Sequence, residues 1–348
     1  MEIILKKFFD EKLFKDWDFI EKKNDLLIFQ SYQWNFNWCK LNKIEENIRI
    51  LIIYDKENPI FIFPLFVDRI FSFKVIRWIG YDLSDYNGPI VGDYLKADQI
   101  NLQEIWGKVF DILKSESDLI FLDKMIDEEN YLCNPFLKYM KCQNYDITYG
   151  INFSNWEETK KEKNKSFQKI RWSKRKLSNL EKLTFFENIQ DVKKEELVMK
   201  IINWKNKTIR NKKKIAFKLY NENFYKKFIN NKNIFFSGLK LGNDYISLSL
   251  NIELKKHILY LMPAYEQDNK ILKYSPGKIL MLELIQFYHD IGKNYFDFGN
   301  GKEFYKNEWS NNKRPLFCYI KNFNILGSLL MYLYKFKRYI NLWKLKIF

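Results

Sequence analysis

The chain has 348 residues, of which 47% are hydrophobic and 18% aromatic. This composition excludes an intrinsically disordered chain, and the length suits two domains with separate cores. No apolar stretch reaches the length of a membrane span, and the N-terminal segment does not read as a signal peptide. Four widely spaced cysteines argue against a disulfide framework or a zinc site. We therefore expect a reduced, cytoplasmic protein without a metal.

The net charge of +16 is distributed unevenly along the chain. Residues 1–150 carry 19 Lys/Arg against 25 Asp/Glu, whereas residues 151–348 carry 40 against 18. This asymmetry predicts that the second half faces an anion, such as a nucleotide cofactor, an anionic lipid surface or a nucleic acid. A solvated basic surface without a partner is the alternative.

Apolar periodicity predicts a mixture of helices and strands in the first half. Helices are expected at 9–24, 31–41 and 98–115, and strands at 48–54, 59–67, 71–79, 118–123 and 145–153. A loop dense in turn residues, WIGYDLSDYNGP, follows the third strand.

The second half repeats the same order of elements. Helices are expected at 155–180, twice within 191–230 and from Ser275 to Gly292, and strands at 183–187, 234–241, 244–253, 257–264, 295–298 and 316–322. The repetition predicts an α+β fold built from two duplicated modules, with mixed sheets flanked by helices. We place the modules at 1–153 and 154–324, followed by a tail at 325–348.

The tail is apolar and aromatic, and no acidic residue follows Glu308. Its basic residues are Lys335, Lys337, Arg338, Lys344 and Lys346. A basic amphipathic helix of this kind can lie on an anionic membrane surface, at the inner face for a cytoplasmic protein. Packing on its own domain is the alternative.

The run Tyr274-Ser275-Pro276-Gly277-Lys278 opens a predicted helix directly after a strand. Proline is tolerated at a helix start, glycine allows close approach of a ligand, and the free N–H groups of the first turn favour an anion. Ser275 and Lys278 add a hydroxyl and a positive charge. The run predicts a phosphate site, although an ordinary serine N-cap would have the same sequence.

The runs YSPGKIL and FDFGNGKEFYKNEW together resemble the C-terminal signature of the FemAB-like and CelD-like branch of the GNAT acyltransferase superfamily. The loop WIGYDLSDYNGP is similar to the first-module loop of that branch. The resemblance implies two tandem GNAT-like modules and acetyl-CoA or another acyl-CoA as co-substrate. It also implies that Tyr274, Ser275, Gly277 and Lys278 bind the cofactor. The Gln/Arg-x-x-Gly-x-Gly/Ala loop of other GNAT enzymes is replaced here by Ser-Pro-Gly-Lys.

Acyl transfer to an amine needs a group that takes the amine proton and a group that protonates the leaving thiolate. Asp297, at a strand end before two glycines, is our candidate base or substrate-orienting carboxylate, with Glu303 as a weaker alternative. Asp297 could equally cap the turn. Tyr305 could protonate the leaving group, and Lys306 could neutralise phosphate.

Asp85 and Tyr86 of the first-module loop are candidates for binding the acceptor, because a tyrosine beside an aspartate suits a sugar. A loop packed on its domain by the tyrosine is the alternative. Trp34 and Trp38 lie four residues apart on a helix, and we expect both in the core.

The segment from Lys160 to Lys182 holds 10 Lys/Arg and 2 Asp/Glu. Arg171 and Arg175 are further candidates for substrate binding there. The interleaved Phe167 and Trp172 fit either nucleic-acid binding or an amphipathic core stripe.

Our leading hypothesis is an N-acyltransferase that moves an acyl group from acyl-CoA to an amine, such as an amino sugar of an envelope polysaccharide. The acceptor could be a small molecule or a lipid- or nucleotide-linked sugar. A peptidoglycan-precursor ligase of the FemAB type, with aminoacyl-tRNA as donor, is the second hypothesis. A non-catalytic module that binds anionic glycans or membranes is the third. The sequence leaves the acceptor, the acyl chain length and the oligomeric state open.

Overall fold

The protein is seen here as a computed structural model that describes residues 1–24, 26–92, 100–127, 134–211, 220–301 and 303–333. Its contacts divide the chain into two compact units, Met1–Ile147 with Pro315–Phe348, and Thr148–Arg314. We call these the first and the second unit. The units are grouped by packing, whereas the module boundaries expected above follow element order and stay a prediction.

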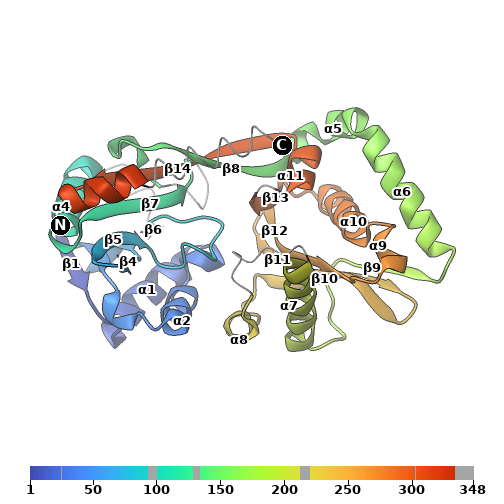
Figure 1. Cartoon of the computed structure of the whole chain (residues 1–348), viewed down its shortest axis with the longest axis horizontal. Coiled ribbons are helices and arrows are strands. Elements are labelled where there is room, and N and C mark those ends of the chain that lie inside the picture. The colour runs from blue at the N-terminus through green and yellow to red at the C-terminus, as the bar shows by residue number, and fades with distance from the viewer. Residues whose placement is uncertain (25, 93–99, 128–133, 212–219, 302, 334–348) are drawn as a thin grey trace. The chain divides into compact units, whose positions relative to one another are not determined.

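The first unit contains two small sheets with helices around them (Figure 1). One sheet has the antiparallel order β1-β2-β3-β6, and β4, β5, β7 and β14 are neighbours in the other. Their bounds are β1 Glu2–Lys6, α1 Glu11–Lys23, α2 Tyr32–Asn42, β2 Ile50–Asp55, β3 Asn58–Phe63, β4 Leu65–Ile70, β5 Phe73–Trp78, β6 Ile90–Val91, α4 Leu102–Glu116, β7 Leu119–Met125 and β14 Asn312–Asn322. Residues 325–333 form a helix after β14.

The strand expected over 59–67 is in fact two strands in two sheets. Pro64 separates β3 from β4, because a residue without a backbone N–H interrupts a hydrogen-bonded ladder. β3 then pairs with β2 and β6, while β4 pairs with β5. The short strands β1 and β6 were not expected from the sequence.

The second unit is one sheet with helices on both faces. The order of its strands is β8-β13-β12-β11-β10-β9, in which only β12 and β13 run parallel. Their bounds are β8 Gln143–Asn152, β9 Leu183–Phe186, β10 Ile234–Leu241, β11 Asp244–Leu254, β12 His257–Tyr265 and β13 Tyr295–Asn300. The helices are α5 Trp156–Glu162, α6 Asn164–Ser178, α7 Lys194–Asn211, α8 Glu222–Tyr225, α9 Asn269–Leu272, α10 Pro276–Asp290 and α11 Phe304–Trp309.

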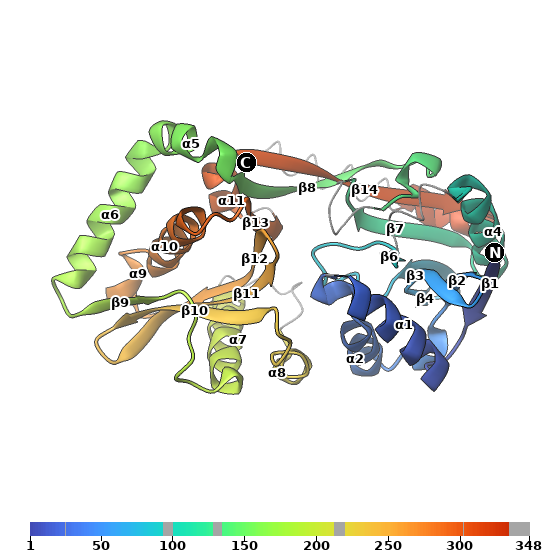
Figure 2. The same ribbon diagram turned by 180° about the vertical axis from the view of Figure 1, so that it is seen from behind.

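The helix α10 covers one face of this sheet, and α7 lies on the opposite face (Figures 1 and 2). α10 is apolar on most sides because it packs against the sheet and against α6 at once. Its buried residues form the core of the second unit together with Trp156, Phe167 and Phe296.

The single helix expected over 155–180 is two helices that meet at Lys163, where φ is −90° and ψ is 10°. The change of direction brings Trp156 of α5 and Phe167 of α6 into the same core, with ring centroids 5.7 Å apart. Both helices keep an amphipathic pattern, so the sequence shows no break between them.

Candidate functional site

The parallel strands β12 and β13 are paired over only three residues. The ladder begins at His257–Tyr295 and ends at Leu259–Asp297, while β12 continues to Tyr265 and β13 to Asn300. β12 stays paired with β11 on its other edge up to Tyr265. The two central strands therefore part beyond Leu259, and this ladder does not pair their facing backbone groups there.

Tyr260 is the first residue of β12 beyond this ladder. It is 2% exposed, and its ring lies 5.6 Å from that of Phe296 on β13. Among the residues that the structure describes, its hydroxyl finds no hydrogen-bond partner. Burial, reinforced by Tyr265, raises the pKa of Tyr260, so the hydroxyl is a neutral donor. A buried donor without a partner at the point where two strands part fits a polar ligand group.

The N-terminus of α10 follows the end of β12. Ser275 has φ 55° and ψ 58°, a left-handed conformation that non-glycine residues seldom adopt. Its carbonyl accepts from the N–H groups of Lys278 and Ile279, but its side chain makes no cap hydrogen bond. The ordinary serine N-cap considered above is therefore wrong. The Ser275 hydroxyl makes no hydrogen bond that caps α10.

Gly277, in the first turn of α10, lies close to the ring of Tyr265. A Cβ atom on Gly277 would lie 2.8 Å from Tyr265 Cδ1, closer than real Cβ contacts. Glycine is needed here because the Tyr265 ring fills the space of a side chain. Sequence reasoning missed Tyr265, since nothing in the local pattern links it to a residue twelve positions later.

Lys278 is held by an acidic partner. Its Nζ lies 3.0 Å from Glu308 Oε2 on α11, and Glu308 Oε1 accepts from Ser166 Oγ of α6 at 3.1 Å. The Lys278 side chain remains 36% exposed. The network joins three helices at the start of α10, and a bound phosphate would compete with Glu308 for Lys278.

Asp297 is buried, with 2% exposure, and both of its carboxylate oxygens have partners. Oδ1 accepts from the Gly299 N–H at 2.7 Å, and Oδ2 accepts from Arg314 Nη2 at 2.7 Å. The guanidinium of Arg314 also lies over the Tyr295 ring, 4.3 Å from its centroid. Asp297 thus caps the turn, which is the alternative that the sequence offered to a role as base or substrate-orienting carboxylate. Sequence reasoning missed Arg314 because the ion pair is set by the fold.

Lys306 closes the same turn from α11. It is 5% exposed, its Nζ donates to the Asn300 carbonyl at 2.5 Å, and it pairs with Glu303 Oε2 at 3.2 Å. Burial is the largest single effect on Glu303 and opposes its ionisation, but the charge of Lys306 and the hydrogen bonds to the carboxylate together lower the pKa of that carboxyl. The Tyr305 ring packs edge-on against Phe298. Lys306 is thus engaged within the turn.

These contacts bring two groups of expected residues together. The Lys278–Glu308 pair joins the start of α10 to α11, and Lys306 joins α11 to the end of β13. The expected cofactor residues and the expected catalytic residues therefore lie in one region of the second unit. We call this region, from the end of β12 to α11, the α10 site.

Arg171 and Arg175 lie on the exposed face of α6. Arg171 lines a pocket of about 270 Å³ near the C-terminal half of α10, whereas the α10 site is at its N-terminus. The other lining residues are Trp156, Phe185, Leu282, Glu283, Gln286, Phe287 and Asp290. Of the two interleaved aromatics, Phe167 is buried and belongs to the core, while Trp172 is 52% exposed.

The residues expected to bind an acceptor belong to the first unit. Tyr86 is 2% exposed and packed inside that unit, and Asp85 is half-buried. Trp34 and Trp38 are buried, which confirms their place in the core. They also hold this loop, because Trp34 Nε1 donates to Ser84 Oγ at 3.1 Å and Trp38 Nε1 donates to Asp82 at 2.7 Å. Tyr86 therefore anchors its loop.

The described residues contain no group of three His, Cys, Asp or Glu side chains arranged to hold a metal ion. In the same part of the chain, no helix is long and apolar enough to cross a bilayer. Cys39, Cys142 and Cys318 are free thiols.

The segment that contains most of the α10 site is similar to a known domain family. Residues 164–307 match the family model described as an acetyltransferase (GNAT) domain. No curated protein matches the chain significantly. The matched segment contains β12, α10, β13 and most of α11.

Solved structures show the same fold over nearly the whole chain. FemX is 12% identical, with a TM-score of 0.56 over 92% of this chain and 98% of its own. A conserved protein of unknown function from Bacteroides thetaiotaomicron is 12% identical, with a TM-score of 0.54 over 91% and 99%. L-PGS from Bacillus licheniformis is 10% identical, with a TM-score of 0.52 over 93% and 96%. The expected α+β fold with sheets flanked by helices is confirmed, and residues 164–307 are similar to the GNAT acetyltransferase domain.

Proposed function

We propose that the protein is an N-acyltransferase that takes an acyl group from acetyl-CoA or another acyl-CoA and transfers it to an amine. The observations that carry this proposal are the parting of β12 and β13 beyond Leu259–Asp297 and the start of α10, which lies against Tyr265 at the end of β12 and has no side-chain cap. The GNAT domain match over the same residues supports acyl transfer as the reaction class.

The residues at the start of α10 fit the pyrophosphate of a coenzyme. The Ser275 hydroxyl is not used as a cap, and the first turn of α10 offers the Gly277 N–H and the positive end of the helix dipole. Lys278 supplies a charge that is one-third exposed. The extended arm of the coenzyme would lie between β12 and β13, where backbone groups and the Tyr260 hydroxyl lack partners in the ladder. The bound thioester would supply the acyl group.

Asp297 acts, in this proposal, by positioning the turn through Gly299 and Arg314. Both of its oxygens are engaged, so the proton of the acceptor amine would pass to water or to a neighbouring group. Tyr305 remains our candidate for protonating the departing thiolate. Lys306 fixes the position of Tyr305, because it ties α11 to the Asn300 carbonyl.

An amino sugar of an envelope polysaccharide remains our proposed acceptor. The Asp85–Tyr86 pair lends it less support than the sequence suggested, because Tyr86 is buried and its ring is not presented for stacking on a sugar. Assays of acetyl transfer to a panel of free amines, amino sugars and nucleotide-linked amino sugars would identify the class.

Calorimetric titration with acetyl-CoA and longer acyl-CoAs tests the donor. We expect binding that Lys278→Ala weakens about tenfold, as for a lost charge-assisted contact to phosphate. Lys270→Ala is the matched control, because Lys270 is exposed on the neighbouring helix α9. Absence of binding across all chain lengths would overturn the proposal.

Aminoacyl transfer from tRNA is the second candidate, supported by the exposed cationic face of α6. Arg171, Arg175 and Lys176 are exposed there, beside the exposed Trp172. Binding of tRNA that weakens steeply with salt, and is lost with Arg171→Ala and Arg175→Ala, would favour this donor. Activity that persists with acyl-CoA in both variants would favour the first. Binding of glycans or membranes without any transfer activity would favour a non-catalytic module.

A further inference from the structure

The helix over residues 325–333 has its apolar side turned to solvent. Ile325, Leu326, Leu329, Tyr332 and Leu333 are exposed, with fractions from 45% to 87%. At 100° per residue these five positions share one arc of about 120°. A solvated helix normally presents polar residues on that side, so a contiguous apolar face of this kind marks an interaction surface.

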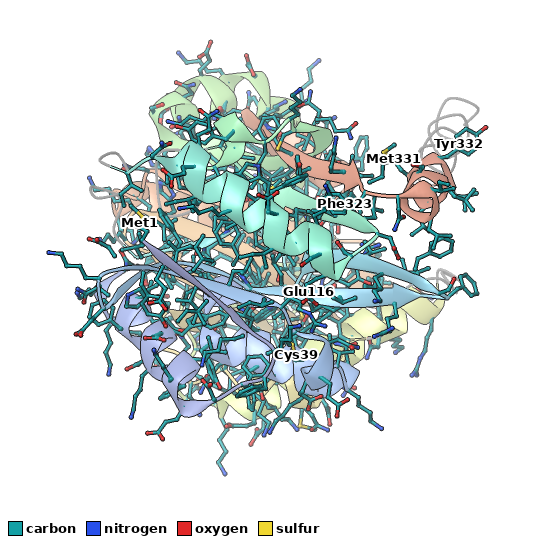
Figure 3. The ribbon with its side chains drawn as sticks, turned by 90° about the vertical axis from the view of Figure 1, so that its left-hand side faces the viewer. Met1, Cys39, Glu116, Phe323, Met331 and Tyr332 are labelled. Atoms are coloured by element: carbon teal, nitrogen blue, oxygen red, sulfur yellow. The ribbon has the colours of Figure 1, made fainter. Side chains whose placement is uncertain are left out.

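The opposite side of this helix is fixed to the first unit. Leu330 and Met331 pack against a cluster formed by Val75, Leu119, Phe121 and Cys318. In Figure 3, Met331 lies on the side of the helix that faces the unit, while Tyr332 projects away from it. The exposed face is therefore not the result of a helix that has detached from its domain.

Contacts with Asp118 also hold the start of the helix against the first unit. A Cβ atom on Gly327 would lie 2.0 Å from the Asp118 carbonyl oxygen, so the helix lies directly against the residue that precedes β7. Asn324 Nδ2 donates to Asp118 Oδ1 at 2.6 Å, and the Gly327 N–H donates to Asn324 Oδ1 at 2.8 Å. These contacts fix which side of the helix meets solvent.

The turn between β4 and β5 adds a second exposed apolar group next to the same cluster. Ile70 packs against that cluster together with Leu330 and Met331. The next residue, Phe71, is 94% exposed and has φ 55°, a conformation that bulky residues seldom adopt. Arg69 and Lys74 are exposed and are opposite each other across this hairpin.

We propose that this surface, formed by the outer face of helix 325–333 and the β4–β5 turn, docks on a bilayer that contains anionic lipids. The apolar side chains would enter the interfacial region, and the basic residues beside them would meet lipid headgroups. The sequence favours this occupant, because no acidic residue follows Glu308 and the chain beyond 333 adds five Lys/Arg. A second copy would bring like charges together. The proposal does not depend on the nature of the acyl donor.

Flotation of the full chain with lipid vesicles tests the proposal. We expect the protein to float with vesicles of phosphatidylcholine and phosphatidylglycerol at low salt, and to float less with phosphatidylcholine alone. The double variant Ile325→Gln with Leu329→Gln should reduce the bound fraction about tenfold or more, because two large apolar groups are lost. The matched control is Leu180→Gln with Ile291→Gln, which removes two similarly exposed apolar side chains from the second unit.

Circular dichroism of each variant checks that the fold is retained. A wild-type protein that does not bind the anionic vesicles would overturn the proposal, and so would equal losses in the two double variants. A concentration-dependent dimer that disappears in Ile325→Gln with Leu329→Gln, without vesicle binding, would also overturn it and assign the surface to a second copy.

Discussion

Arg314 Nη2 lies 2.7 Å from Asp297 Oδ2, and this ion pair is among the most buried in the described part of the chain. The Asp297 side chain is 2% exposed and that of Arg314 is 11% exposed. The pair connects the end of β13 to the start of β14. Removing one partner of such a pair leaves a buried charge without compensation, which is strongly destabilising.

We therefore expect Arg314→Met to lower the free energy of unfolding by about 3 kcal/mol or more. Urea denaturation measures this change. Glu11→Gln is the control, because Glu11 pairs with Lys15 on an exposed helix face, and such pairs contribute about 0.5 kcal/mol or less. Similar losses for the two variants would show that the Asp297–Arg314 pair does not stabilise the turn.

Gly277→Ala should weaken the binding of acyl-CoA. The new Cβ would lie 2.8 Å from Tyr265 Cδ1, so the ring must move, and it lies beside the proposed pyrophosphate position. Gly107→Ala in α4 is a matched control, because nothing lies within 4 Å of its new Cβ. That substitution should stabilise the fold by about 0.5–1 kcal/mol and leave binding unchanged. Calorimetric titration and thermal unfolding distinguish the two effects, and unchanged affinity in Gly277→Ala would contradict the assignment.

The contribution of Glu303 to the free energy of unfolding should depend on pH. Burial opposes ionisation of Glu303, but the charge of Lys306 together with hydrogen bonds to the carboxylate lowers its pKa in the folded protein. A carboxyl with a lowered folded pKa stabilises the fold above its unfolded pKa, near 4.5, and this contribution is lost as the pH falls further. The stability difference between wild type and Glu303→Gln should therefore be largest at neutral pH and should shrink below about pH 4.5. A difference that grows in acid would contradict this sign.

The sequence predicted local elements well and tertiary partners poorly. The strand, turn and helix around Ser275 are confirmed, because the proline and the apolar periodicity are local signals. The sequence predicted one strand through Pro64, because the division into two strands in different sheets depends on pairing across the fold. The partners Arg314 and Tyr265 left no local signal, since the fold alone brings them to Asp297 and Gly277.

The Lys278–Glu308 pair yields a prediction in which two variants change binding in opposite directions. Lys278→Ala removes a cation from the start of α10 and should weaken acyl-CoA binding. Glu308→Gln should strengthen acyl-CoA binding several-fold. In this variant Lys278 has no ion pair with residue 308 that must be broken before it can bind phosphate. Both affinities are measured by calorimetric titration at one salt concentration. Glu283→Gln is the control and should leave the affinity unchanged. Glu283 lies further along α10, where it pairs with Lys174 of α6 at 2.8 Å. If Glu308→Gln weakens binding as Lys278→Ala does, Glu308 holds Lys278 in its binding position and does not compete with phosphate.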